Sequence, residues 1–191
     1  PQLIIAKSWL AAAKGLERRA LELARDAAGA AHQSGQYAVE AEALHHAARF
    51  GDPTVAGRLA ELAERVHGRV VTLQARHAAA VAAADGRALD AVSTEFEDAG
   101  WLLSAADSAA QAASLHDQAG QRRRSMESAA RALHLATQCG GAATPAIKSA
   151  ARPLPVTSRE REIATLIAAG LSNREIAEQL TLSIRTVERP I

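Results

Sequence analysis

With 191 residues and a formal net charge of +1, the chain has room for one domain of ordinary size and a small module, and its overall charge indicates neither a nucleic-acid nor a membrane partner. Alanine, the strongest helix former, accounts for 48 residues and the β-branched alternation of strands is almost absent, so we expect an all-α fold. A single cysteine, Cys139, excludes an intrachain disulfide framework, and with no bilayer-length apolar run and no signal peptide we expect a cytoplasmic protein without a membrane span.

The N-terminal segment, residues 3–33, is predicted to contain at least one long helix. One face of this helix carries Leu16, Ala20, Leu23 and Ala27. Glycines then punctuate the chain in two interleaved series, Gly35, Gly68 and Gly100, and Gly51, Gly86 and Gly120. Each series repeats about every 34 residues, which leaves helical stretches of a length typical of paired antiparallel helices.

Three helical hairpins follow from this rhythm: 37–50 with 54–67, 69–84 with 88–98, and 101–119 with 122–138. Within them the helical period is kept by Leu59, Leu62, Ala63 and Val66, and by Leu89, Val92 and Phe96. Two helices per unit of about 34 residues are typical of tetratricopeptide solenoids, although only Trp101 of the consensus start is in place. We therefore predict antiparallel helical-hairpin (tetratricopeptide-like) repeats over residues 1–140, with a surface that binds a protein or small-molecule effector.

Residues 141–156 are predicted to be a linker, because Pro153 and Pro155 discourage a continuous helix into the next segment. The segment after it, residues 157–191, carries two capping boxes of the form S/T-x-x-E, at Thr157 with Glu160 and at Ser172 with Glu175. Each box predicts the start of a helix. The first helix has an apolar face of Ile163, Leu166 and Ile167 and ends at Gly170.

The second helix of this segment is predicted from about Asn173 to Leu180, with Ile176, Ala177 and Leu180 turned inward. After a tight turn, Ser183 is a suitable N-cap for a third helix that carries Ile184 and Val187 inward. Short capped helices in this order form the layout of a helix-turn-helix, which places its recognition helix in the major groove of DNA.

The strings TSREREI, GLSNREIAEQL and LSIRTVE in this segment resemble the DNA-binding domain of LuxR-type bacterial transcription regulators. The resemblance implies that the recognition helix starts at Ser183 and that Glu188 and Arg189 touch base edges. It also implies phosphate contacts at or near helix starts, from Ser172, Asn173, Arg185 and Thr186. Pro190 stands where the family has His, so we expect a chain that is truncated inside the recognition helix. A fourth helix, which the family uses for homodimerisation, would lie beyond Ile191.

Helical repeats followed by this domain resemble the C-terminal third of the large ATP-binding, maltose-regulator-like LuxR proteins. No phosphate-binding G-x-x-x-x-G-K-[ST] motif occurs in the chain, so we expect no cofactor here and ATP only in an upstream module. We expect no enzymatic activity, because no catalytic constellation is evident. His45 and His46 are not expected to bind a metal, and the run 122–124 is expected to be a solvated face. Trp9 and Trp101 are expected to pack in the core or between repeats, with ligand stacking as the alternative.

The charges of residues 157–191 leave an alternative open. Five arginines are balanced by five glutamates, so this segment offers little positive field for DNA. Two functions remain: a sequence-specific DNA-binding transcription regulator that binds promoter DNA as a homodimer, or a protein- or ligand-binding repeat module whose truncated DNA-binding segment is non-functional.

Overall fold

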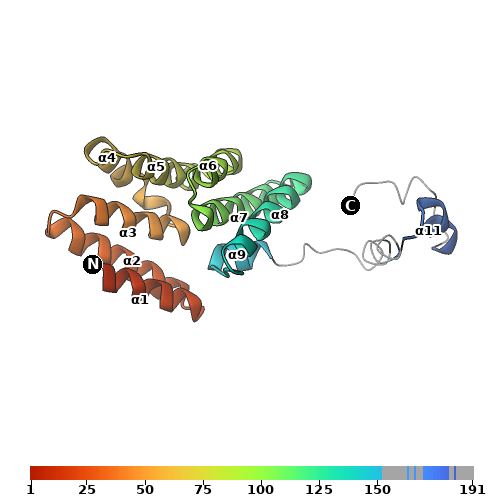
Figure 1. Ribbon diagram of the computed structural model, residues 1–191, viewed down its shortest axis with the longest axis horizontal. Coiled ribbons are helices and arrows are strands. Elements are labelled where there is room, and N and C mark those ends of the chain that lie inside the picture. Colours follow the sequence, from red (N-terminus) through yellow and green to blue (C-terminus); the bar gives the residue numbers. More distant parts are fainter. Residues whose placement is uncertain (152–162, 164–165, 167–169, 181–182, 184–191) are drawn as a thin grey trace. The chain divides into compact units, whose positions relative to one another are not determined.

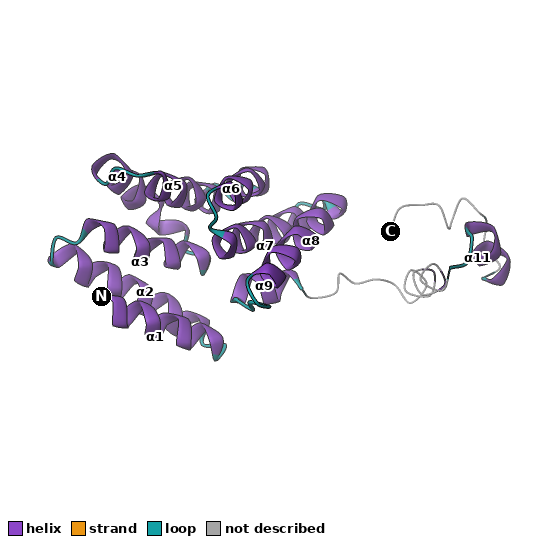
Figure 2. Ribbon diagram, in the orientation of Figure 1, coloured by secondary structure: helices purple, strands orange, loops and turns teal. Residues whose placement is uncertain are grey.

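The structure is a computed structural model that describes residues 1–151, 163, 166, 170–180 and 183. The chain divides into two compact units, Pro1–Arg152 and Pro153–Ile191. The helices of the first unit are α1 (Gln2–Ala13), α2 (Glu17–Gln33), α3 (Tyr37–Arg49), the short 3-10 helix η1 (Pro53–Val55), α4 (Ala56–Arg65), α5 (Arg69–Ala82), α6 (Gly86–Asp98), α7 (Leu102–Gln118), α8 (Arg122–Gln138) and α9 (Pro145–Ala150). All regular structure in the described residues is helical, which confirms the all-α prediction (Figure 2).

Consecutive helices of the first unit pack as antiparallel pairs, with α2 against both α1 and α3 and α7 against both α6 and α8 (Figure 1). Two large hydrophobic clusters and a smaller one of Ala11, Ala12 and Ala20 hold them together. The first contains Leu59 and Leu62 and the second Leu89 and Phe96, all with fully buried side chains, which confirms the predicted inward faces of these helices. Alanine fills most of the remaining core positions, because its small side chain lets helices approach closely.

The turns between helices are built on residues with positive φ, but two of them differ from the predicted glycine rhythm. Gly51 and Gly120 end their helices with φ of 89° and 69°, as expected for a helix C-terminus. Between α5 and α6, however, the positive φ of 50° belongs to Ala84, and Gly86 is the first residue of α6. Gly68 likewise caps the start of α5 rather than the end of a helix. The periodic spacing located these turns to within a few residues without identifying the residue that turns.

The N-terminal segment forms two helices, α1 and α2, which agrees with the prediction of at least one long helix there. Gly15 has φ of 75° and ends the first of them, so Leu16 lies in the connection and is 54% exposed. Its predicted place on the apolar face is therefore wrong, whereas Ala20 and Ala27 are fully buried as predicted. Trp101 also differs from expectation, since it precedes α7 and is 42% exposed.

The first half of the predicted linker, 141–156, contains α9. Thr144 caps this helix by accepting a hydrogen bond from the backbone N–H of Ile147 at 3.2 Å, and Pro145 occupies its first turn. Proline is favourable at that position because its missing N–H would be unpaired in any case. Ile147 is 3% exposed within the second hydrophobic cluster, so α9 belongs to the first unit. Pro153 and Pro155 lie outside the described residues.

Candidate functional site

Helix α11 (Asn173–Gln179) is the described part of the predicted helix-turn-helix, and a reciprocal cap fixes its start. The Ser172 backbone N–H and hydroxyl donate to Oε2 of Glu175 at 2.8 and 2.6 Å, and the Glu175 N–H donates to Ser172 Oγ at 3.4 Å. These bonds confirm the predicted capping box. The hydrogen bond from the Ser172 side chain also lowers the pKa of the Glu175 carboxyl, so the cap is intact at neutral pH.

The apolar face of α11 is buried as predicted. Ile176, Ala177 and Leu180 are 0%, 4% and 7% exposed and form one cluster with Ile163. Gly170 precedes this helix with φ of 86°, in the left-handed conformation expected at a helix end. The N-terminus of α11 and the face opposite this cluster are therefore exposed.

Two of the predicted site residues, Ser172 and Asn173, are exposed beside each other at the start of α11. The exposed side chain of Asn173 can donate a hydrogen bond to a phosphate, whereas the N–H and hydroxyl of Ser172 both donate to Glu175. Arg174 follows them and forms an exposed ion pair with Glu178 at 3.2 Å. The other predicted contacts lie outside the described residues: Arg185, Thr186, Glu188 and Arg189, together with the first capping box, Thr157 with Glu160.

The first unit contains a buried ion pair that sequence reasoning missed. Arg49 on α3 and Asp107 on α7 are 7% and 1% exposed. Nε of Arg49 donates to Oδ2 of Asp107 at 2.7 Å, and Nη2 lies 2.7 Å from the same oxygen without hydrogen-bond alignment. The Thr144 hydroxyl donates to the other oxygen of Asp107, so the pair also reaches the N-cap of α9. The guanidinium lies 4.4 Å from the ring centroid of Trp9, which adds a cation–π contact.

A second buried chain of polar side chains runs beside this pair. Nε2 of His45 is 3.1 Å from Nδ1 of His77, and Nε2 of His77 is 2.7 Å from Oε1 of Gln111. Because the Gln111 amide N–H donates to the Ala48 carbonyl at 2.9 Å, its oxygen must accept from His77. Nδ1 of His77 then accepts from His45, and both rings are neutral. Burial lowers the pKa of His77 to about 4 and holds the pKa of His45 well below its usual value.

The two adjacent histidines have different hydrogen-bond partners. His45 points into the buried chain, whereas His46 accepts a hydrogen bond from the Trp9 indole N–H at 3.3 Å. Among the described residues, no three His, Cys, Asp or Glu side chains gather in a way that could hold a metal ion. Likewise, no helix among the residues that the structure describes is long and apolar enough to span a bilayer.

Comparisons with known proteins agree with the geometry of α11. Residues 154–189 match the family of bacterial regulatory proteins, luxR family. The tetrathionate response regulatory protein TtrR of Salmonella typhimurium is 54% identical over 33 residues, which are 17% of this chain and 16% of that protein. No solved structure matches the chain. A LuxR-type helix-turn-helix domain therefore lies near the C-terminus. Such domains imply DNA-binding transcriptional regulation and are typically non-enzymatic.

Proposed function

We propose that this chain is part of a bacterial LuxR-family transcription regulator, in which residues 157–191 bind promoter DNA and the helical unit binds an effector. The match of residues 154–189 to the luxR family carries the proposal. The capping box of Ser172 and Glu175 supports it, because it orients the helix that precedes the recognition helix.

The proposed contacts divide into two classes. Ser172, Asn173, Arg185 and Thr186 bind phosphates and set the position of the domain on the duplex. Glu188 and Arg189 read bases in the major groove, since glutamate accepts from cytosine N4 and arginine donates to guanine O6 and N7. The exposure of Ser172 and Asn173 at one helix start supports the first class.

The finer assignment is to the large ATP-binding, maltose-regulator-like regulators, with tetratricopeptide-like repeats before the DNA-binding domain. The antiparallel pairing of consecutive helices in the first unit supports this order of domains. In this proposal ATP binds an upstream module, a helix beyond Ile191 mediates homodimerisation, and the protein acts in the cytoplasm, where bacterial promoters are accessible.

Selection of duplexes from a random library, followed by fluorescence anisotropy, tests the proposal directly. A selected duplex is expected to bind at least about tenfold more tightly than a shuffled duplex of equal composition. Arg185→Ala should weaken binding to both duplexes. It should also reduce the slope of log affinity against log salt concentration by the amount expected for about one phosphate contact. Arg18→Ala, which removes the same charge from an exposed side chain of α2, is the matched control. Equal affinity for selected and shuffled duplexes would contradict sequence-specific binding.

The balanced charge of residues 157–191 favours the second candidate, a repeat module without DNA binding. In that case neither duplex binds at low salt, while the first unit still binds its effector. An effector titration on the same preparation therefore separates the two functions.

A further inference from the structure

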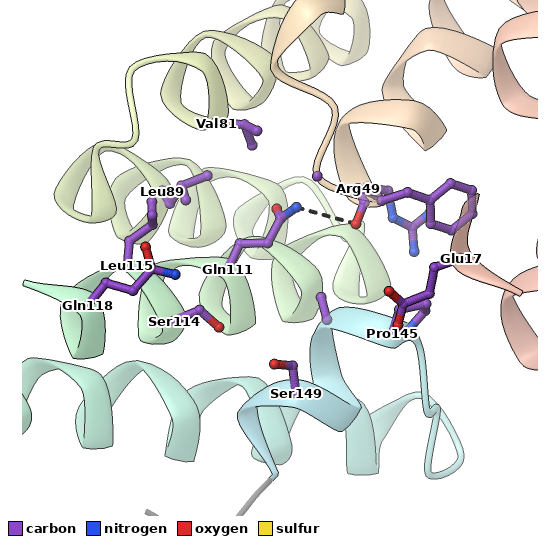
Figure 3. Close-up of a pocket in the computed structure, with 13 residues that line it drawn as sticks. Glu17, Arg49, Val81, Leu89, Gln111, Ser114, Leu115, Gln118, Pro145 and Ser149 are labelled. Carbon is purple, nitrogen blue, oxygen red and sulfur yellow. Dashed lines mark hydrogen bonds between the residues drawn. The ribbon is translucent and has the colours of Figure 1, made fainter. Parts of the chain in front are cut away.

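The first unit contains a cavity of about 400 Å³ where α3, α7 and α9 approach the start of α2. Its size lies within the range of small-molecule sites. Figure 3 shows Glu17, Arg49 and Pro145 at one end of the cavity and Leu115 and Gln118 at the other. Side chains from six helices line it, so its shape depends on the assembled unit.

The charges around this cavity leave one side chain without a counter-ion. The carboxylate of Glu17, the first residue of α2, makes no side-chain hydrogen bond or ion pair within the part of the chain that the structure describes. The only cation of the lining, Arg49, is already neutralised by the buried carboxylate of Asp107. The residues that line the cavity therefore carry a net negative charge once Arg49 is paired with Asp107, which favours a cation over an anion.

The rest of the cavity fits an apolar body with a few polar groups. Phe50, Val81 and Leu115 contribute apolar surface to the same cavity as Glu17. A carboxylate beside apolar surface attracts an organic ammonium group. Gln118 supplies an amide at the opposite end, which can bond a polar group on a ligand that spans the cavity.

One wall of the cavity is α9, through Pro145, Ala146 and Ser149. This helix is the last element of the first unit before the chain passes to the second unit. Its N-cap, Thr144, donates to Asp107, the partner of Arg49. A ligand that contacts both α9 and Arg49 therefore bridges the helix to the core that anchors it.

We propose that this cavity binds a small organic cation with an apolar body, that Glu17 receives its ammonium group, and that the bound cation holds α9 against the unit. The assignment stands on the negative local charge, the apolar lining and the contribution of α9. The binding of this cation rests on the first unit alone and not on the proposed DNA binding.

Three probes with the same indole body but different charge test the assignment by calorimetry on the whole chain: tryptamine, tryptophol and indole-3-acetate. Tryptamine is expected to bind about fivefold more tightly than neutral tryptophol, and indole-3-acetate more weakly than both. The preference for tryptamine should shrink at high salt, because exposed charges are screened. Equal affinities, a preference for the anion, or no binding of tryptamine at millimolar concentration would overturn the proposal.

Two variants place the binding in this cavity. Glu17→Gln should abolish the preference for tryptamine over tryptophol, whereas Glu64→Gln, which neutralises an exposed carboxylate on α4, should preserve it. An unchanged preference in Glu17→Gln contradicts the site. Amide exchange of α9 is the second readout, since tryptamine should slow exchange at Lys148, whose N–H donates to the Thr144 carbonyl. Binding without this protection contradicts the role of α9. Because these measurements contain no DNA, their failure and the failure of the DNA-binding test are distinguishable.

Discussion

The buried pair of Arg49 and Asp107 makes the strongest prediction about stability. The Asp107→Ala substitution leaves the Arg49 guanidinium without its partner, in a side chain that is only 6% exposed. It also removes the acceptor of the hydrogen bond from the Thr144 hydroxyl. Removal of one partner from a buried ion pair costs about 3–5 kcal/mol, because the remaining charge is desolvated and uncompensated. For a unit of this size each kcal/mol lowers Tm by about 2–4 °C, so we expect a decrease of roughly 10 °C.

Urea and thermal denaturation followed by circular dichroism measure this cost. Glu127→Ala is the control, because it breaks an exposed ion pair of similar length, 2.8 Å between Oε1 of Glu127 and Nε of Arg123. Loss of this exposed pair should change the free energy of unfolding by less than about 0.5 kcal/mol. The double variant Arg49→Met with Asp107→Leu should be more stable than Asp107→Ala, since it removes both charges and keeps the volume. If Asp107→Ala costs no more than Glu127→Ala, the argument from desolvation is refuted.

Three further predictions concern single sites. Because the pKa of His77 is about 4 in the folded state and about 6.5 in the unfolded state, stability is fully present above pH 6.5 and should fall by about 2 kcal/mol between pH 7 and 5. Urea titrations should show a smaller fall in His77→Gln, and an equal fall would contradict the assignment. Gly86→Ala should destabilise by about 1–3 kcal/mol, because the new Cβ would lie 2.8 Å from the His116 ring, whereas Gly29→Ala, with open space, should stabilise by about 0.5–1 kcal/mol. Equal thermal shifts would refute that contrast. Ser172→Ala should cost about 1 kcal/mol, measured as faster amide exchange in α11, and unchanged exchange would show that the cap is dispensable.

The features that could be predicted from the sequence are those with local causes. The start of α11 follows from Ser172 and Glu175, which are only three residues apart, and the helix end at Gly170 needs no distant partner. The failures also have local explanations. Pro145 lies in the predicted linker, but after the N-cap Thr144 it begins helix α9. Leu16 fitted an apolar period that Gly15 interrupts.

The buried polar contacts could not be predicted in the same way, because their partners lie far apart in the sequence. Residues 104–113 of α7 consist of alanine and small polar side chains apart from Asp107 and Gln111, and a helix with so little polar surface is expected to be buried all round. A carboxylate in such a helix requires a partner, since an isolated buried charge is too costly. The pattern therefore indicates that Asp107 pairs with a cation. It does not indicate which of the 22 lysines and arginines that cation is, because the choice of Arg49 depends on how α3 crosses α7. Long-range geometry of this kind sets both the ion pair and the cavity beside it.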